Sequence, residues 1–556
     1  MTNPLIAFAL VAEEYEKSGD PIKGLAPLFR PLLDKQSGQR FDPAAFAREF
    51  GKYYGLKMAE FVARALRERM AEIGLLVKED GALDQYTVPK LTGDAFHSTF
   101  DESKISETLE AFAKWAKRET VRLGRSVARE ELDEALLSRL ARPEFSTAFL
   151  DAGEKRDSKR IKELLGQSTP DQLRATDTLL DYLVASFVLA ANEKAPDVFE
   201  ALSSIAFGSL VADAVAGLAE PGIKDMPDPP LRVVIDGPLI LDVLDLNDSS
   251  HKAYADGLFG IMREANLRLA TFDHIVDEVR ESIRSVVKAF QAGNEYGPLG
   301  ERLRSSKGFS KYAISIADSL EDKIKELDLF ILPSDIYERA DFKRYFNDAS
   351  FDSMRNAIGE VHTQIERRIR DTKSVAAVIR LKKDNRHPSS IFQSGTTFLT
   401  RNSALFKKVN YVLSLHKSDP DPRFTIVTDS QLGGVLWFSL GASSDSYSKL
   451  SRHRLIANCA TAIVPQREVV HRIADLLEEM DQKLRDEFTV LMRDKRASMC
   501  PMRITAGLLD QVDNDSSMRI LELMREEIAA PILEQAAVEQ ERALEERRGL
   551  QRALHQ

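Results

Sequence analysis

The sequence has only two cysteines, Cys459 and Cys500, among 556 residues. Two thiols cannot build a disulfide framework or a zinc site with four thiolate ligands. Long apolar runs are also missing, since no stretch approaches the roughly 20 apolar residues that a membrane-spanning helix needs. The short apolar run near the start lacks the basic leader and small-residue cleavage site of a secretory signal. We therefore expect a cytoplasmic protein without a membrane segment.

An excess of positive charge is lacking too. The formal net charge is -10 and the sequence pI is about 5.6. These values argue against a general nucleic-acid coat protein, although a local basic rim can coexist with an acidic pocket. The hydrophobic content of 43% and the charged content of 29% are ordinary for a globular chain. The length predicts several domains.

A proline-rich stretch, PGIKDMPDPP at 221–230, cannot hold a helix and marks the clearest domain boundary. Before it the apolar spacing is helical, and after it short β-rich runs alternate with helices. Helical spacing returns near residue 465 and ends in a charged helix, either solvated or partner-binding. We expect four regions: helical 1–95, helical 96–225, α/β 231–440 and helical 465–556.

The N-terminal region ends with a change of pattern. Helical spacing stops at Gly74, and two short β-rich runs flank an Asp80-Gly81 turn. A helix followed by such a hairpin resembles a winged helix over about 40–90; the alternative is a helical subdomain with a hairpin. The apolar helices at 178–218 are candidates for a homodimer interface or a protein partner.

Four short runs in the α/β region are rich in β-branched residues. They are separated by helical stretches, which is typical of βα units in a buried parallel sheet. The runs are LRVVID (231–236), LRLATF (267–272), TTFLT (396–400) and FTIVT (424–428).

Acidic or amide side chains accompany these strands. Asp236 closes the first run, Glu278 lies one turn into the helix after the second, Asp371 opens DTKSVAAVIRL, and Asn402 follows the third. Each alone has a structural explanation, such as an N-cap or a charge on a helix surface. Because the carboxyl ends of parallel strands share one edge, the ordered set predicts a common site.

The run resembles the PIN-domain nuclease family. The matching segments, in family order, are VVIDGPLILDVL, LATFDHIVDEVRESI, RDTKSVAAVIRLK, TTFLTRNSALFKKV and FTIVTDSQLGGVLWF. The resemblance covers 231–440 and implies an α/β fold, with a PIN-like parallel sheet flanked by helices between mainly helical N- and C-terminal regions.

The resemblance also implies a site and an activity. Asp236, Glu278 and Asp371 become catalytic, metal-binding acids, with Asn402 in the fourth place and Asp429 as a possible extra ligand. Such oxygens suit Mg²⁺ or Mn²⁺, which activates water for attack on a phosphodiester. The expected substrate is RNA more than DNA, and a large multidomain member resembles a bacterial stress or phage-defence effector. Three cations near the acids are candidates for substrate phosphate: Lys373, Arg401 and Arg280.

Three departures from the family pattern affect this interpretation. Asn402 is neutral where the family has Asp, Gly237-Pro238 replaces small polar residues, and the gap from Glu278 to Asp371 is long. The gap predicts an inserted helical segment at about 290–360, a lid or substrate arm. Its candidate nucleic-acid contacts are Arg302, Arg304, Lys307, Lys311, Tyr312, Lys343, Arg344 and Tyr345.

Two alternatives to an active nuclease follow from these residues. Asn402 favours a weak or inactive PIN-like module that binds nucleic acid or protein. A phosphoacceptor receiver-like domain would need a Lys at the end of the last strand, and FTIVTDS offers none.

Overall fold

The computed structural model describes most of the chain. The described residues are 4–18, 21–54, 56, 58, 60–79, 85–90, 102–141, 170–218, 230–292, 297–359, 365–382, 388, 390–415, 424–440 and 444–530. The predicted proline-rich boundary lies almost wholly outside them, as does the end of the predicted C-terminal charged helix.

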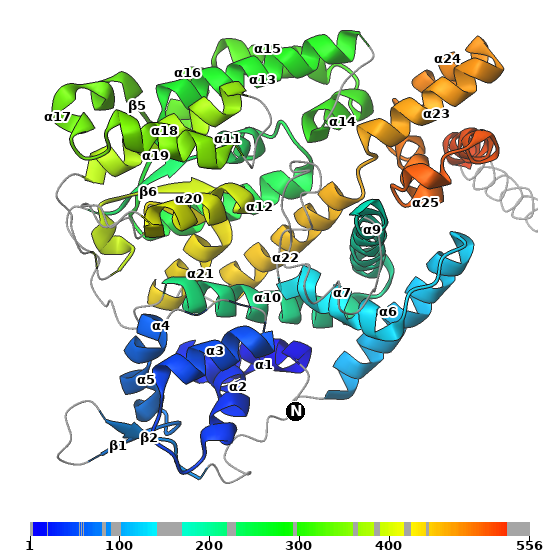
Figure 1. Cartoon of the computed structure of the whole chain (residues 1–556). Coiled ribbons are helices and arrows are strands. Elements are labelled where there is room, and N and C mark those ends of the chain that lie inside the picture. Colours follow the sequence, from blue (N-terminus) through cyan, green and yellow to red (C-terminus); the bar gives the residue numbers. More distant parts are fainter. Residues whose placement is uncertain are drawn as a thin grey trace, which may run out of the picture.

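A five-stranded parallel sheet forms the centre of the α/β region, so the predicted fold class is confirmed at this level (Figure 1). In spatial order the strands are β5 (Phe330–Leu332), β4 (Arg268–Phe272), β3 (Arg232–Ile235), β6 (Thr396–Thr400) and β7 (Ile426–Thr428). Val233 of β3 stands between Leu269 of β4 and Thr397 of β6. All residues of β6 and β7 are buried, as expected for strands covered on both faces.

The sheet contains one strand that the sequence patterns missed. The segment predicted as a helical insertion, 290–360, includes β5, which pairs in parallel with β4 along the sheet edge. We missed it because Phe330–Leu332 is only three residues long and Pro333 follows directly. The long gap between Glu278 and Asp371 therefore carries one sheet strand and its two crossover connections.

Helices connect the strands of this region. Their bounds are α11 (Gly237–Val243), α12 (Ser249–Glu264), α13 (Asp273–Gln291), α14 (Gly297–Ser305), α15 (Phe309–Asp318), α16 (Leu320–Glu326), α17 (Ala340–Lys343), α18 (Asp348–Ile358), α19 (Ile365–Lys382), α20 (Ser403–Leu415) and α21 (Asp429–Leu440). Several polar residues proposed as nucleic-acid contacts serve this packing. Arg302 pairs with Asp245 across about 3.1 Å, and Tyr312 donates to the Leu244 carbonyl.

The N-terminal 90 residues form helices and a small hairpin. They contain α1 (Pro4–Ser18), α2 (Pro21–Leu33), α3 (Pro43–Tyr54), α4 (Glu60–Ala65), α5 (Arg67–Glu72), β1 (Val77–Lys78) and β2 (Tyr86–Thr87). The predicted hairpin is confirmed, because β1 and β2 pair antiparallel. The winged-helix likeness stays a prediction.

The next helical region packs between the N-terminal helices and the sheet region (Figure 1). Its described helices are α6 (Glu102–Arg122), α7 (Arg129–Ala141), α9 (Pro170–Lys194) and α10 (Pro196–Leu218). Trp437 of α21 joins the regions, with ring contacts to Tyr15 of α1 at 4.3 Å and Phe207 of α10 at 5.4 Å. One hydrophobic core runs through all of these elements.

This shared core bears on the expected dimer surface. Most of the large apolar side chains described along α9 and α10, such as Leu183 and Val211, are buried inside the chain. They are therefore not a free interface for a second copy.

The C-terminal region has a small core of its own. It follows α22 (Ser444–Ala462) and contains α23 (Arg467–Met480), α24 (Gln482–Leu491), α25 (Cys500–Thr505) and a helix from residue 514 through 530. Cys459 and Cys500 are both buried and do not form a disulfide. Across the described ranges, none of the helices combines the length and apolar character needed to cross a membrane.

The crossing of α1 and α10 gives a first prediction. A Cβ on Gly208 would lie 1.8 Å from the Phe8 carbonyl oxygen, so the two helix backbones touch there. We expect Gly208→Ala to cost about 1–3 kcal/mol, because the helices must separate to admit the methyl group. The melting temperature measures this. Gly260→Ala in α12 is the matched control, since its Cβ meets no atom within 4 Å and alanine favours a helix; equal effects of the two variants would contradict the close crossing.

Candidate functional site

The strand order reverses between β3 and β6. The chain passes from β3 to β4 and β5 on one side, then continues in β6 and β7 on the other. Ligands of open α/β sheets bind outside the carboxyl ends of the strands at such a switch point. Asp236 directly follows β3 there, and Thr400, the last residue of β6, donates from Oγ1 to Asp236 Oδ2 at 2.6 Å. The first predicted acid is therefore held at the switch point.

The packing of α11 explains why Gly237 and Pro238 follow Asp236. Asp236 caps α11, with the Gly237 amide donating to its Oδ1 at 2.8 Å, and proline is well suited to the first helical turn. A Cβ on Gly237 would lie 3.3 Å from Val279 Cγ2. The small residue lets the start of α11 pack closely on α13, the helix that carries Glu278.

The three predicted acids interact electrostatically. Burial, then the charges of Asp371 and Glu278, raise the pKa of Asp236 to about 7, although the Thr400 hydrogen bond opposes this. Burial, then Asp371, raise the pKa of Glu278, whereas Arg370 and Arg367 lower it. These mutual charge effects group Asp236, Glu278 and Asp371 as a candidate acidic site, which we call the acid site.

The donor chemistry of the acid site suits a hard divalent cation, since neighbouring carboxylates that are partly buried repel one another without a positive charge. Within the described ranges, however, no three His, Cys, Asp or Glu side chains converge tightly enough to make a preformed cation site. Mg²⁺ is commonly held by one or two carboxylates with waters. The residues therefore fit a cation held by a subset of these acids.

Positive side chains of α19 border the acid site. The Arg370 Nη1 atom lies 3.9 Å from Glu278 Oε1, and its guanidinium also pairs with Glu281. Burial, then the charge of Lys373, one of the predicted phosphate contacts, lower the pKa of the His274 imidazole. The contact of Lys373 with substrate phosphate stays a prediction, and the contribution of Arg370 was missed.

Arg280 points away from the acids. Its guanidinium pairs with Asp277 and Glu321 and donates to the Ala317 carbonyl between α15 and α16. Residues two apart on a helix face different directions, so Arg280 cannot share the face of Glu278. In this structure Arg280 is thus directed away from the acid site, toward α15 and α16.

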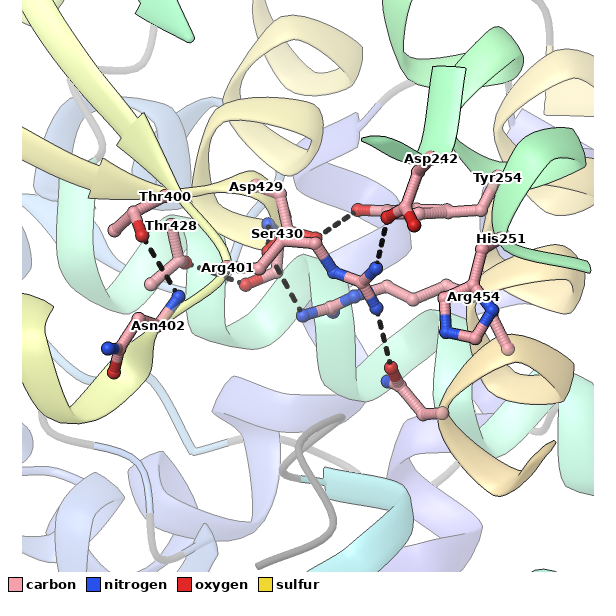
Figure 2. A network of polar contacts seen from close by, with 12 residues as sticks. Asp242, His251, Tyr254, Thr400, Arg401, Asn402, Thr428, Asp429, Ser430 and Arg454 are labelled. Atoms are coloured by element: carbon pink, nitrogen blue, oxygen red, sulfur yellow. Dashed lines mark hydrogen bonds and ion pairs between the residues drawn. The ribbon is translucent and has the colours of Figure 1, made fainter. Parts of the chain in front are cut away.

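Arg401 is committed to a buried polar network (Figure 2). Its Nη1 pairs with Asp242 of α11, its Nη2 donates to Asn458 of α22 at 3.4 Å, and its Nε lies 3.8 Å from Asp429. The guanidinium also lies over the ring of Tyr254 at 5.7 Å. These partners hold the Arg401 charge inside the protein, so in this structure the guanidinium is directed toward them and not toward a substrate.

Asp429 belongs to the same network. It accepts a hydrogen bond from Tyr254 at 2.7 Å and lies 3.6 Å from Arg454 Nη2. Its side chain is 3% exposed. These contacts place Asp429 among the partners of Arg401 and Arg454, two strands away from Asp236, so it gives the acid site no compensating charge.

Asn402 follows β6 as predicted, but its side-chain amide caps the helix that follows. Its Oδ1 accepts from the Leu405 amide at 3.0 Å, which caps α20, and its backbone amide donates to Thr400 Oγ1 at 3.0 Å. The second bond leaves the Thr400 hydroxyl proton for Asp236. Asn402 therefore supports the acid site through Thr400.

Two residues near the acids were not singled out from the sequence. His274, at the start of α13, contacts Ser374 of α19, with 2.8 Å between Nε2 and Oγ. The sequence contained part of the signal for this pair, because His274 precedes Glu278 by four residues and both therefore lie on one helix face. No local pattern indicates Ser374 as the partner of His274.

These residues also resemble a Ser-His-Asp arrangement, because Asp273 Oδ1 lies 3.6 Å from His274 Nδ1. The geometry does not fit a nucleophile. Ser374 is 3% exposed and bonds the Arg370 carbonyl inside α19, while Asp273 accepts from Ser334 Oγ at 2.6 Å. The separation of 3.6 Å also exceeds a hydrogen bond. We therefore assign this group to packing between elements.

Comparison with known proteins found no matching protein-family model, no matching curated protein and no matching solved structure. The chemistry of the acid site is thus the basis for any functional assignment.

Proposed function

We propose that this protein is a PIN-like, metal-dependent nuclease that hydrolyses phosphodiester bonds, with RNA as the preferred substrate over DNA. One observation carries the proposal. Asp236 stands at the switch point of a parallel sheet, where burial and the charges of Asp371 and Glu278 raise its pKa to about 7. Strongly perturbed carboxyl groups at such a place are typical of functional sites.

Bound Mg²⁺ or Mn²⁺ would supply charge that activates water and stabilises the leaving oxygen. Asp236 and one of its acidic neighbours, Glu278 or Asp371, would hold the cation. Thr400 and the Gly237 amide each bind one Asp236 oxygen, so they orient the carboxylate. Lys373 would meet substrate phosphate. The helical regions packed on the sheet would select substrate or partner, as suits a bacterial stress or phage-defence effector.

Cleavage of a labelled RNA with Mn²⁺ or Mg²⁺ tests the proposal. We expect Asp236→Asn to lower the rate about 10³-fold, because it weakens cation binding at the switch point. Asp256→Asn is the control, since Asp256 forms an exposed ion pair with Lys252 on α12. A single-stranded DNA of the same sequence tests the preference for RNA. Absence of Mn²⁺ binding, together with full retention of activity in Asp236→Asn, would contradict the nuclease assignment.

A second candidate is a catalytically weak or inactive PIN-like module that acts as a scaffold for nucleic acid or protein. The capping role of Asn402 favours it, because that amide oxygen is used by Leu405. The same experiment separates the two. RNA binding without cleavage in any divalent cation, unchanged by Asp236→Asn, supports the scaffold.

A further inference from the structure

We propose that the hydrogen bond between His274 and Ser374 is a clamp that sets the separation of Glu278 and Asp371 in the acid site. His274 is thus a positioning residue. The inference rests on the proposed function for its consequence, cation binding, but the clamp itself is a property of two helices.

The clamp follows from helical spacing. His274 and Glu278 are four residues apart on α13, so their side chains lie on one face. Asp371 and Ser374 are three residues apart on α19 and also share a face. His274 contacts Ser374, and the charge of Asp371 acts on Glu278. The two helices therefore interact through two adjacent pairs of side chains. We call His274 and Ser374 the neutral rung, and Glu278 and Asp371 the acidic rung.

The hydrogen bond of the neutral rung counteracts the repulsion within the acidic rung. Asp371 and Glu278 repel each other, whereas the hydrogen bond between His274 and Ser374 holds the helices together. Arg370 adds a second tie, because it reaches from α19 to Glu278 and Glu281. Without the neutral rung, we expect the carboxylates to move apart.

The direction of the hydrogen bond can be assigned. The Ser374 hydroxyl has one proton and bonds the Arg370 carbonyl at 3.2 Å, so it accepts from His274. On this assignment the clamp uses the tautomer with the imidazole proton on Nε2. The ring stacks on Phe272 with 5.3 Å between centroids, and its Nδ1 is buried without a hydrogen-bond partner in the described part of the chain. Only the Nε2–H group is needed for the clamp.

That assignment defines the variants. His274→Phe keeps a ring against Phe272 but removes the donor, and Ser374→Ala removes the acceptor. His274→Gln restores a donor at the position of Nε2. The control is His251→Phe, because His251 Nε2 pairs with Thr461 Oγ1 at 2.9 Å in the same way, between α12 and α22. The charges that act on His251 are those of Arg401, Asp242 and Asp248.

The first measurement is Mn²⁺ affinity of the full chain by calorimetry. We expect His274→Phe and Ser374→Ala to raise the Kd about tenfold, the size seen when groups that orient ligands are removed. His274→Gln should stay within about threefold of the wild type, and His251→Phe should leave the Kd unchanged. An unchanged Kd in both His274→Phe and Ser374→Ala, with Mn²⁺ bound by the wild type, overturns the clamp.

The second measurement needs no metal. We expect Asp371→Asn to raise the melting temperature at pH 8, because it removes a charge held against Asp236 and Glu278. In the His274→Phe background this rise should shrink, since the carboxylates are already free to separate. An equal rise in both backgrounds overturns the clamp even if the wild type binds no Mn²⁺. If the wild type binds no Mn²⁺ but the rise does shrink in the His274→Phe background, the proposed function is overturned and the clamp is not.

Discussion

Replacing Arg401 by methionine is expected to destabilise the folded protein by about 3–5 kcal/mol, the range for breaking a buried ion pair from one side. Asp242 is 1% exposed and would lose its charged partner, while it keeps the hydrogen bond from Asn247. Asp429 would lose a nearby cation as well. Chemical unfolding and the melting temperature measure the loss.

Two further variants make this result specific. Arg284→Met removes an exposed pair with Asp318 and should cost at most about 1 kcal/mol. The double variant Arg401→Met with Asp242→Leu should recover part of the stability, because it removes both charges together. If Arg401→Met destabilises the protein no more than Arg284→Met, the network does not stabilise the fold. Arg401 is then again a candidate for phosphate contact.

Asp236→Asn is expected to stabilise the metal-free protein at pH 8 by about 2–3 kcal/mol. The folded pKa of Asp236 is raised to about 7 from an ordinary value of 3.8. A difference of this size corresponds to roughly 4 kcal/mol, which we reduce because part of the side chain reaches solvent. The amide carries no charge, and it can accept from Gly237 while donating to Thr400.

The sign of the pH dependence follows from the raised pKa. Below about pH 4 the carboxyl group is protonated in both the folded and the unfolded chain, so its charge costs nothing. Between about pH 4 and 7 the unfolded chain releases the proton first, and wild-type stability falls as the pH rises. The advantage of Asp236→Asn should therefore be small at pH 4.5 and complete at pH 8.

Thermal unfolding at the two pH values tests this expectation. Mn²⁺ should stabilise the wild type and leave Asp236→Asn nearly unchanged, since binding to the folded state adds stability by mass action. Asp256→Asn should show neither effect. A loss of stability in Asp236→Asn at pH 8 would mean that the carboxylate is structurally satisfied and the site is not built for a cation.

The sequence predicted the centre of the sheet well, because the information there is local. Four runs of β-branched residues between helices correspond to β3, β4, β6 and β7. The fifth strand was missed because three residues before a proline carry no periodic signal. Pairing with β4 makes Phe330–Leu332 a strand, and that pairing is a long-range contact.

The acids and the cations differ in how far they could be predicted. Asp236 ends a buried strand and Glu278 lies one turn into a helix, so the backbone alone brings them to one edge. Long cations choose partners across the fold. Arg280 turns toward Glu321 of α16, and Arg401 turns toward Asp242 of α11, although both lie close in sequence to predicted acids.

The sequence by itself determined that a short buried strand carries Asp236 to the carboxyl edge of a parallel sheet, since burial is a local property. The expectation that Asp371 opens its helix was wrong, because α19 begins at Ile365. Only the tertiary structure decided which side chains surround that edge. It put Thr400 against Asp236, His274 against Ser374, and Arg401 inside the protein. The physical reason is that hydrogen bonds and ion pairs join residues far apart in the chain, so packing of the helices selects each partner.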